Sequence, residues 1–167
     1  MDENTHAELH TFIQRASKAT YAGDGTEVTP WRTGFKELEY REDDWYYRDS
    51  YAGSLRSWGQ EVVWHNDIPT WICSYGGGME HTHMNETFAR KTFSFLKKAL
   101  LAKKSVIDFR PRGPKEFQEG NWKYECTVTG DITTFTGREY IRYNGVVVFT
   151  HYFHGGLIVP RQHNVTL

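Results

Sequence analysis

Residues 44–78 read DWYYRDSYAGSLRSWGQEVVWHNDIPTWICSYGGG, a stretch in which large aromatic rings are interleaved with polar side chains. This composition favours half-buried β-strands over a helical bundle. The tripeptide HND at 65–67 lies between two strand-like runs and is a hairpin signal, although a weaker one than Asn-Gly. We therefore expect consecutive antiparallel strands here.

A second stretch, residues 121–156, aligns with the first when one residue is inserted near Thr136. It reads NWKYECTVTGDITTFTGREYIRYNGVVVFTHYFHGG, with the Asn-Gly hairpin signal at 144–145. The alignment predicts an internal duplication. Identical residues meet at Trp45 and Trp122, Tyr47 and Tyr124, Gly53 and Gly130, Gly59 and Gly137, Glu61 and Glu139, Asn66 and Asn144, Gly77 and Gly155, and Gly78 and Gly156.

Each stretch follows a segment with helical periodicity. The apolar positions are Leu9, Phe12, Ile13 and Ala16 in the first segment, and Phe88, Thr92, Phe95, Leu96 and Ala99 in the second, where Asn85 is the expected cap. We expect a single domain, 1–167, with an α+β fold. Its two tandem units, approximately 5–78 and 86–158, would each hold a helix and three or four antiparallel strands, related by a pseudo-twofold axis. One sheet and two sheets are both compatible with this pattern.

Bulk properties exclude several classes of protein. Charged residues make up 25% of the chain and the net charge is −1, so we expect no nucleic-acid partner. The basic run RKTFSFLKKALLAKK (90–104) is interpreted as the solvated face of a helix. No apolar run approaches a membrane span. Two cysteines and a polar amino terminus indicate a cytoplasmic protein without a disulfide scaffold.

The glycines at 76–78 raise the question of a phosphate site, because a strand, glycines and a helix start in that order form phosphate-binding turns. The stretch lacks the Lys-Ser/Thr pair of a P-loop and the spacing of a dinucleotide fingerprint. We interpret it as a structural joint between strand and helix, with an anion site as the alternative.

Strand alternation places a few polar groups among aromatic rings on one face of each predicted strand. These groups are Asp49, Glu61, Cys73, Glu139 and His151. An aromatic pocket with few polar groups is typical of a small-molecule site. The predicted ligand-binding residues are Trp45, Tyr47, Trp71, Tyr75, Tyr124, Phe149, Phe153 and His154.

Glu61 and Glu139 are the strongest candidates for a catalytic pair, because the predicted duplication makes them equivalent. Two carboxylates near a twofold axis could act as general acid and base. Alternatively, each pairs with Arg56, Arg138 or a backbone amide. Cys73 and His151 are equivalent positions that could form a thiolate couple, or simply belong to the core.

The link GMEHTHMNE contains the weak metal-ligand candidates His81 and His83, which His154 or Glu86 could complete. Spacing fixes no third ligand, and exposed loop histidines are common. We therefore predict no metal site and no cofactor.

Several runs resemble a bacterial domain of unknown function that often follows an Xre-type helix-turn-helix segment. They are RASKATYAGDG, WYYRDSYAG, WGQEVVW, IPTWICSYGG, RPRGPKEFQEGNWKYECTVTGD, FTGREYI and HYFHGG, spanning roughly 12–157. The resemblance implies recurring positions that include Arg112, Gly113, Tyr124 and Glu139, but no catalytic residues. We expect no DNA-binding segment before the domain, so that a role as a sensor arm would need a separate partner.

Three functions follow from these observations. The first is a binding or sensor module for an unidentified small molecule. The second is a small hydrolase or lyase that uses Glu61 or Glu139. The third is an interaction module or homodimer, which predicts a filled interior and exposed Trp31, Trp58 or Trp64.

Overall fold

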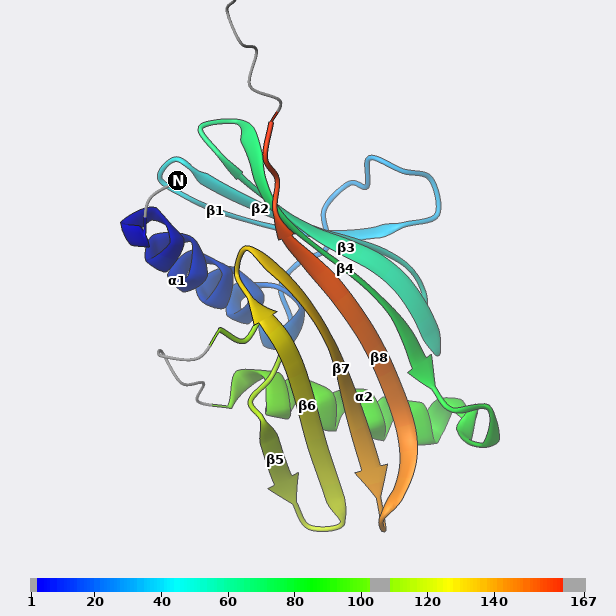
Figure 1. The fold of residues 1–167 in the computed structure, drawn as a ribbon. Helices are drawn as coiled ribbons and strands as arrows, with labels where there is room; N and C mark the ends of the chain where they lie inside the picture. The colour runs from blue at the N-terminus through cyan, green and yellow to red at the C-terminus, as the bar shows by residue number, and fades with distance from the viewer. Residues whose placement is uncertain (1–2, 103–108, 161–167) are drawn as a thin grey trace, which may run out of the picture.

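The computed structural model describes residues 3–102 and 109–160, and these residues form two α-helices, two short 3₁₀ helices and eight strands (Figure 1). The helices are α1 (Glu3–Ala19), η1 (Tyr21–Gly23), η2 (His81–His83) and α2 (Glu86–Leu101). The strands are β1 (Lys36–Glu42), β2 (Trp45–Gly53), β3 (Arg56–His65), β4 (Ile68–Met79), β5 (Glu116–Glu119), β6 (Trp122–Asp131), β7 (Thr134–Tyr143) and β8 (Val146–Leu157).

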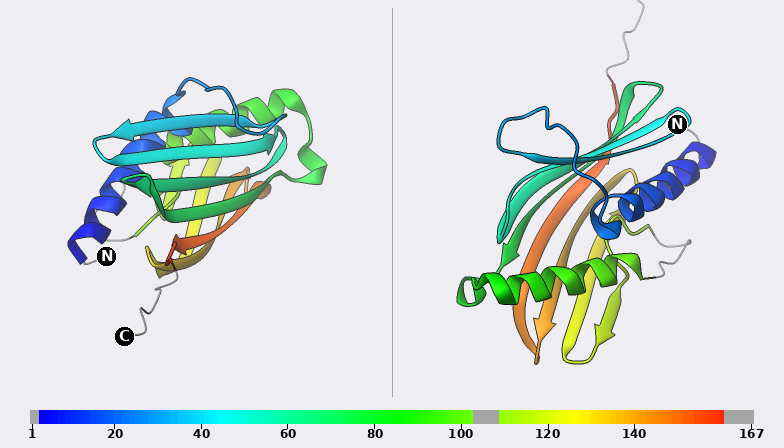
Figure 2. Two further views of the ribbon diagram at one scale, coloured as in Figure 1. Left: turned by 90° about the horizontal axis from the view of Figure 1, so that it is seen from above. Right: turned by 180° about the vertical axis from the view of Figure 1, so that it is seen from behind.

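All eight described strands belong to one antiparallel sheet, in the order β1-β2-β3-β4-β8-β7-β6-β5. The centre of the sheet is the pair β4 and β8, where Tyr75 lies opposite Phe153. Both α-helices pack against the same face, which we call the inner face (Figure 2). The α+β class is thus confirmed, with one sheet as its dominant element.

Two hairpins have the turn geometry that the sequence predicts. Asn66 and Asp67 have φ values of 51° and 62°, and Asn144 and Gly145 have values of 51° and 80°. Positive φ at both central residues is typical of the tight turns that suit the twist of paired strands. The HND and YNG signals therefore mark the β3–β4 and β7–β8 hairpins.

The glycines of SYGGG lie inside β4, not between a strand and a helix as predicted. Gly77 pairs with Ser57 of β3 and with His151 of β8. A β-carbon at Gly77 would overlap the carbonyl oxygen of Thr150, and φ is 134° at this residue. The glycines therefore let two strands approach closely, and the helix begins only at Glu86.

The helices cover the inner face with the residues that the periodicity selects. Leu9, Phe12 and Ala16 of α1 are fully buried, as are Thr92 and Ala99 of α2. The side chain of Asn85 accepts a 3.0 Å hydrogen bond from the Phe88 amide, which confirms the predicted cap. Within the described part of the chain, no helix is long and apolar enough to cross a membrane.

On the opposite, outer face, the segment 24–35 covers part of β2. Arg48 forms a buried ion pair with Glu37, donates a 2.9 Å hydrogen bond to the Thr29 carbonyl, and lies under the Trp31 ring. β2 is consequently buried on both of its faces, which is more than the half-buried pattern predicts.

Candidate functional site

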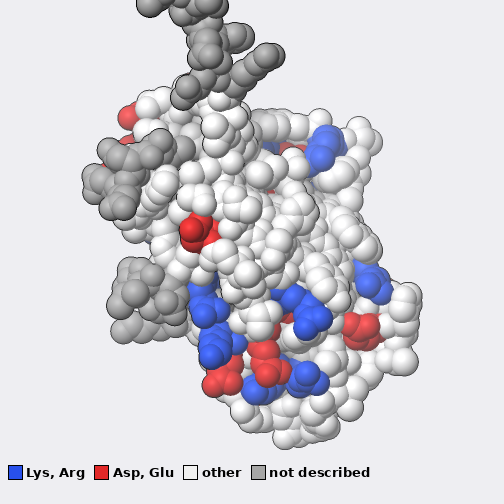
Figure 3. All heavy atoms as spheres, in the orientation of Figure 1, with Lys and Arg blue, Asp and Glu red and all other residues white. Residues whose placement is uncertain are grey.

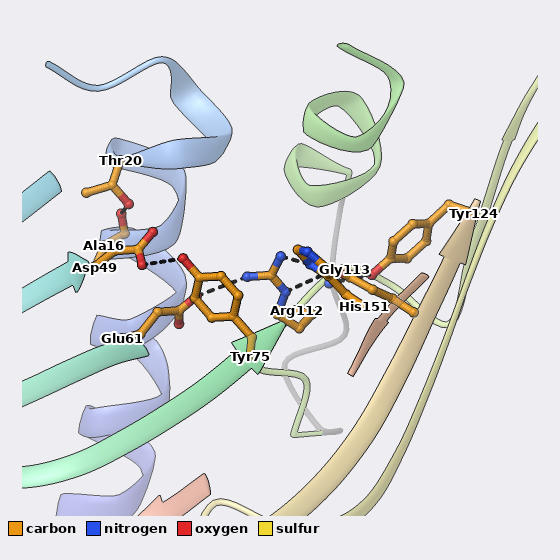
Figure 4. Close-up of polar contacts among 10 residues, drawn as sticks. Ala16, Thr20, Asp49, Glu61, Tyr75, Arg112, Gly113, Tyr124 and His151 are labelled. Carbon is orange, nitrogen blue, oxygen red and sulfur yellow. Dashed lines mark hydrogen bonds and ion pairs between the residues drawn. The ribbon is translucent and has the colours of Figure 1, made fainter. Parts of the chain in front are cut away.

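Arg112 contacts both of the glutamates that the sequence singles out, and Figure 4 shows its guanidinium directed towards Glu61. Its Nη1 is 3.0 Å from Oε1 of Glu61, and its Nη2 is 2.9 Å from Oε1 of Glu139. All three side chains are buried. The two glutamates thus share one cation, Arg112, which was not predicted from the sequence as their partner, and their role as general acid and base stays a prediction.

Local structure explains how Arg112 reaches this position. The segment that leads into β5 passes over the inner face, and the amide of Gly113 donates a 3.0 Å hydrogen bond to the Tyr124 hydroxyl. That hydroxyl donates a 2.6 Å hydrogen bond to Oε2 of Glu139. A β-carbon at residue 113 would overlap the Tyr124 ring, so glycine is required for this approach. The hydrogen bonds connect the backbone of the segment to β6 and β7.

The electrostatics of Glu139 follow from this contact. Burial alone would raise its pKa, but the Arg112 guanidinium and hydrogen bonds from His151 and Tyr124 lower it to about 2. Glu139 is therefore ionised at neutral pH and weakly basic. A general base needs a pKa near the working pH, so the geometry makes Glu139 a partner for Arg112 rather than a proton acceptor.

Asp49 has the opposite character. It lies on β2 opposite Glu61 of β3, and its Oδ1 accepts a 2.7 Å hydrogen bond from the Tyr75 hydroxyl. Burial, followed by repulsion from Glu61, raises its pKa to about 7. Asp49 is thus the buried carboxyl whose charge changes near neutral pH.

His151 completes the polar group at the centre of the inner face. Its Nδ1 is 3.3 Å from Oε1 of Glu139, and the side chain is buried. Burial lowers the pKa of His151, although Glu139 opposes this effect. The imidazole is therefore neutral at pH 7. Neither ring nitrogen makes a well-aligned hydrogen bond to a residue that the structure describes, although the Glu139 carboxylate and the Gly77 backbone both act on the pKa of the ring.

A cavity of about 260 Å³ opens above these groups, between α2, η1, the β2–β3 turn and the central strands. Asp49, Tyr75, Arg112 and His151 are the polar residues at its inner side. Lys36 and Lys97 line it as well, and each has an acidic partner, Glu27 and Asp24 respectively. The remaining lining residues are Tyr21, Tyr51, Gly53, Ser54, Leu55, Ser57, Gly78, Phe93, Leu96 and Phe149.

Two of the predicted ligand-binding aromatics, Tyr75 and Phe149, line this cavity. The others pack within the core or at its margin. Trp71 stacks on Phe135 at 5.6 Å, and Trp45 stacks between Phe12 and His65. Tyr47, Tyr124 and Phe153 are buried as well and are not among the lining residues.

Two further predicted groupings are wrong. His154 is exposed on the outer face, because it follows the inward-facing Phe153 on β8. Cys73 lies opposite Glu61 and Gly155, whereas His151 lies opposite Gly77 and Glu139, so the two do not form a couple. Burial raises the pKa of the Cys73 thiol well above its usual value, which leaves it protonated.

The link histidines have other partners. Nε2 of His81 is 3.2 Å from Nη1 of Arg56, and Nδ1 of His83 is 2.8 Å from the Thr82 hydroxyl. Within residues 3–102 and 109–160, no group of three or more His, Cys, Asp or Glu side chains is placed to hold a metal ion.

The outer face carries exposed aromatic residues. Trp58 is 60% exposed and Tyr152 is 58% exposed, while Trp31 packs edge-on against the half-buried Trp64. Lysines and arginines on this face are interspersed with acidic residues and leave a broad uncharged surface (Figure 3). The interaction-module hypothesis and the absence of a nucleic-acid partner both stay predictions. Of the basic run, Lys103 and Lys104 lie outside the described residues.

Arg112 is the main residue that sequence reasoning did not place in the site. Its presence follows from a requirement of charge, because two buried carboxylates on β3 and β7 of one sheet need a buried cation. RPRGP at 110–114 supplies one between prolines that restrict its backbone. Tyr21, Tyr51 and Phe93 carried no signal, because only the tertiary fold brings η1, the end of β2 and α2 together.

Comparison with known proteins provides one match. A family model described as a domain of unknown function, DUF5680, matches residues 49–158, a range that includes Asp49, Glu61, Arg112, Glu139 and His151. The search of curated proteins and the search of solved structures each found no significant match. The match agrees with the resemblance to a domain of unknown function and carries no information about a helix-turn-helix partner.

Proposed function

The chain belongs to the family of the domain of unknown function DUF5680, and we propose that it is a small-molecule binding domain whose ligand occupies the cavity above Asp49, Arg112 and His151. The observation that supports this proposal most is a partly open cavity that combines aromatic walls with buried polar groups on its inner side. Small-molecule sites typically have this composition. A sensor role in the cytoplasm is part of the same proposal.

The polar group supports binding because it is held in place before a ligand arrives. Arg112 is positioned by two carboxylates, and one of these, Glu139, also accepts a hydrogen bond from Tyr124. Such a network costs free energy to assemble in a protein interior. Preorganised polar groups increase affinity, since little ordering is left to occur on binding.

The test compares two matched variants by native mass spectrometry of protein purified without added ligand. Ser57→Phe places a ring in the cavity, whereas Ser74→Phe makes the same change on the outer face of neighbouring β4. We expect an adduct on the wild type and on Ser74→Phe, and none on Ser57→Phe. Thermal melting of both variants checks that they fold. An adduct of equal occupancy on Ser57→Phe would exclude this cavity as the site.

A second candidate, a small hydrolase or lyase, is supported by Asp49 rather than by the glutamates. Asp49 lines the cavity and its pKa is raised to about 7, which suits a general base. The check is turnover of a panel of esters and hydroxy acids. Asp49→Asn should abolish turnover without lowering the melting temperature, and an unchanged rate would remove this candidate.

We also propose that the two halves of the sheet arose by duplication. Supporting this are the strand order, which reads symmetrically about the β4–β8 pair, and the placement of a helix before each set of four strands. Equivalent glycines, Gly53 and Gly130, have φ values of 106° and 95° at the ends of β2 and β6. On this proposal the site is asymmetric, since Asp49 has Cys126 as its sheet equivalent.

A further inference from the structure

We propose, as a deepening of the binding function above and resting on it, that the cavity takes a small organic cation. The ligand would be an alkyl or arylalkyl ammonium whose N–H groups face Asp49 and His151. Three features carry this inference: the balance of charge, the hydrogen-bonding character of the inner groups, and the aromatic walls.

The buried charges around the cavity do not cancel. Asp49, Glu61 and Glu139 are three buried carboxyls, and Arg112 is the one buried guanidinium beside them among the described residues. The two lysines of the lining add no free positive charge, because Lys36 lies 3.3 Å from Glu27 and Lys97 forms an ion pair with Asp24. With Asp49 ionised, three buried negative charges face the one positive charge of Arg112 among the described residues, which favours a cation beside Asp49.

Two of the inner groups, Asp49 and His151, can accept hydrogen bonds from a ligand, whereas Arg112 and Tyr75 already donate theirs to carboxylates. Ionised Glu139 is an acceptor only, so the imidazole nitrogen facing it, Nδ1 of His151, is the one that carries the hydrogen. Nε2 of the neutral ring is then left as an acceptor, buried and without a hydrogen-bond partner in the described residues. The Asp49 carboxylate accepts from Tyr75 and has further lone pairs. A ligand with N–H donors can form hydrogen bonds to both of these acceptors, Nε2 of His151 and the Asp49 carboxylate.

The walls suit the apolar part of such a ligand. Tyr21, Tyr51, Phe93 and Phe149 line the cavity together with Tyr75. Ring faces attract cations, most strongly where water is excluded. Tyr75 already has one cation near its ring, since the Arg112 guanidinium carbon is 5.2 Å from its centroid.

Cation binding should depend on pH through Asp49. The charged or titratable groups that face it are Glu61 on β3, Tyr75 and Cys73 on β4, Tyr51 and Tyr47 on β2, Tyr21 on η1 and Arg112. The pKa values of these tyrosines and of Cys73 are raised by burial, and the pKa of Arg112 is raised by its carboxylate partners despite burial, so neither the tyrosines, Cys73 nor Arg112 titrates near pH 7. A bound cation stabilises ionised Asp49, so binding below pH 7 releases a proton.

The experiment is an ¹H–¹⁵N NMR titration of the full chain with phenethylammonium and with its neutral analogue, phenethyl alcohol, from pH 6 to pH 8. At pH 8 we expect the ammonium ion to bind at least about tenfold more tightly than the alcohol. Its affinity should fall by up to about tenfold per pH unit below pH 7, while that of the alcohol stays constant. Asp49→Asn should remove both the preference and the pH dependence. Asp67→Asn, the same change in an exposed turn, should retain them.

The possible failures are distinct. If both probes bind equally to the wild type and neither binds to Ser57→Phe, the cation class is wrong and the cavity remains a binding site. If a preference for ammonium persists unchanged in Asp49→Asn, the assignment to Asp49 is overturned. If neither probe shifts resonances of the cavity residues at millimolar concentration, the inference and the binding function both fail.

Discussion

At the scale of single residues, the centre of the molecule depends on one arginine. Arg112 contacts Glu61 and Glu139 in a region from which water is largely excluded. Removing one partner of a buried ion pair leaves the others uncompensated, which is more costly than losing an exposed contact. Replacement of Arg112 should therefore lower the free energy of unfolding by a measurable amount.

Arg112→Met should lower the free energy of unfolding by about 3–5 kcal/mol at pH 7. The deficit should shrink as the pH falls, since without the guanidinium the pKa of Glu139 rises and protonation neutralises the buried carboxylates. Urea denaturation between pH 4 and pH 7 measures this. The control is Arg138→Met, which changes an exposed arginine on β7 and should cost less than about 1 kcal/mol. Equal losses for the two variants would contradict the account.

A second prediction concerns Asp49, whose pKa is shifted in the opposite direction to that of Glu139. Its pKa is raised to about 7 in the folded protein, so the folded state binds the proton more tightly than the unfolded chain does. The contribution of protonated Asp49 to the stability of the wild type is then fully present below pH 4, and it is lost as the pH rises through 7. Relative to Asp49→Asn, the free energy of unfolding should decrease by about 1.4 kcal/mol per pH unit across this window. A difference that stays constant from pH 4 to pH 8 would show that Asp49 is not desolvated.

Sequence reasoning identified Glu61 and Glu139 but not their partner. Equivalence within the proposed duplication pointed to the two glutamates, whereas Arg112 has no such equivalent in the alignment. Asp49 was recognised as a polar residue on an inward face, and its importance depends on Tyr75 and on burial. The hydrogen bond from Tyr75 and the burial of Asp49 both arise only in the folded structure, so no local sequence pattern predicts them.

At the scale of elements, the glycines of β4 determine how closely the strands pack. Gly77→Ala should destabilise the fold by several kcal/mol, about 3 or more, because the added methyl meets the Thr150 carbonyl and φ is unfavourable. Gly34→Ala is the matched control: φ is also positive, at 80°, but nothing lies within 4 Å of a β-carbon there. It should cost about 1 kcal/mol. Thermal unfolding of both variants separates close approach from backbone strain.

The helices and hairpins were predictable because their signals are local. Asn85 with its amphipathic helix, and the HND and YNG turns, each depend on neighbours within a few residues. The run SYGGG was misplaced for the same reason. From its neighbours in sequence alone, a run of glycines predicts a connection between two elements. Its role in β4 depends instead on β3 and β8, which come from other parts of the sequence.

At the scale of the whole molecule, the β4–β8 pairing joins the two halves into one sheet. Alternating strands predict a buried face equally well for one sheet or for two, so the sequence could not choose between them. Hydrogen exchange should distinguish the outcomes. Amides of β4 and β8 should be the slowest to exchange, and those of the edge strands β1 and β5 among the fastest in the sheet. Independent opening of the two halves, with β4 and β8 exchanging as edges, would contradict a single sheet.

The most direct test of the central claim is the electron density of crystals grown from protein purified without added ligand. The account predicts density for a bound compound in the cavity, in contact with Asp49 or with Nε2 of His151. It also predicts that the Ser57→Phe side chain fills this space and that the density is lost. A wild-type cavity that is filled by the protein's own side chains, with no ligand density beside Asp49 or Nε2 of His151, would contradict it.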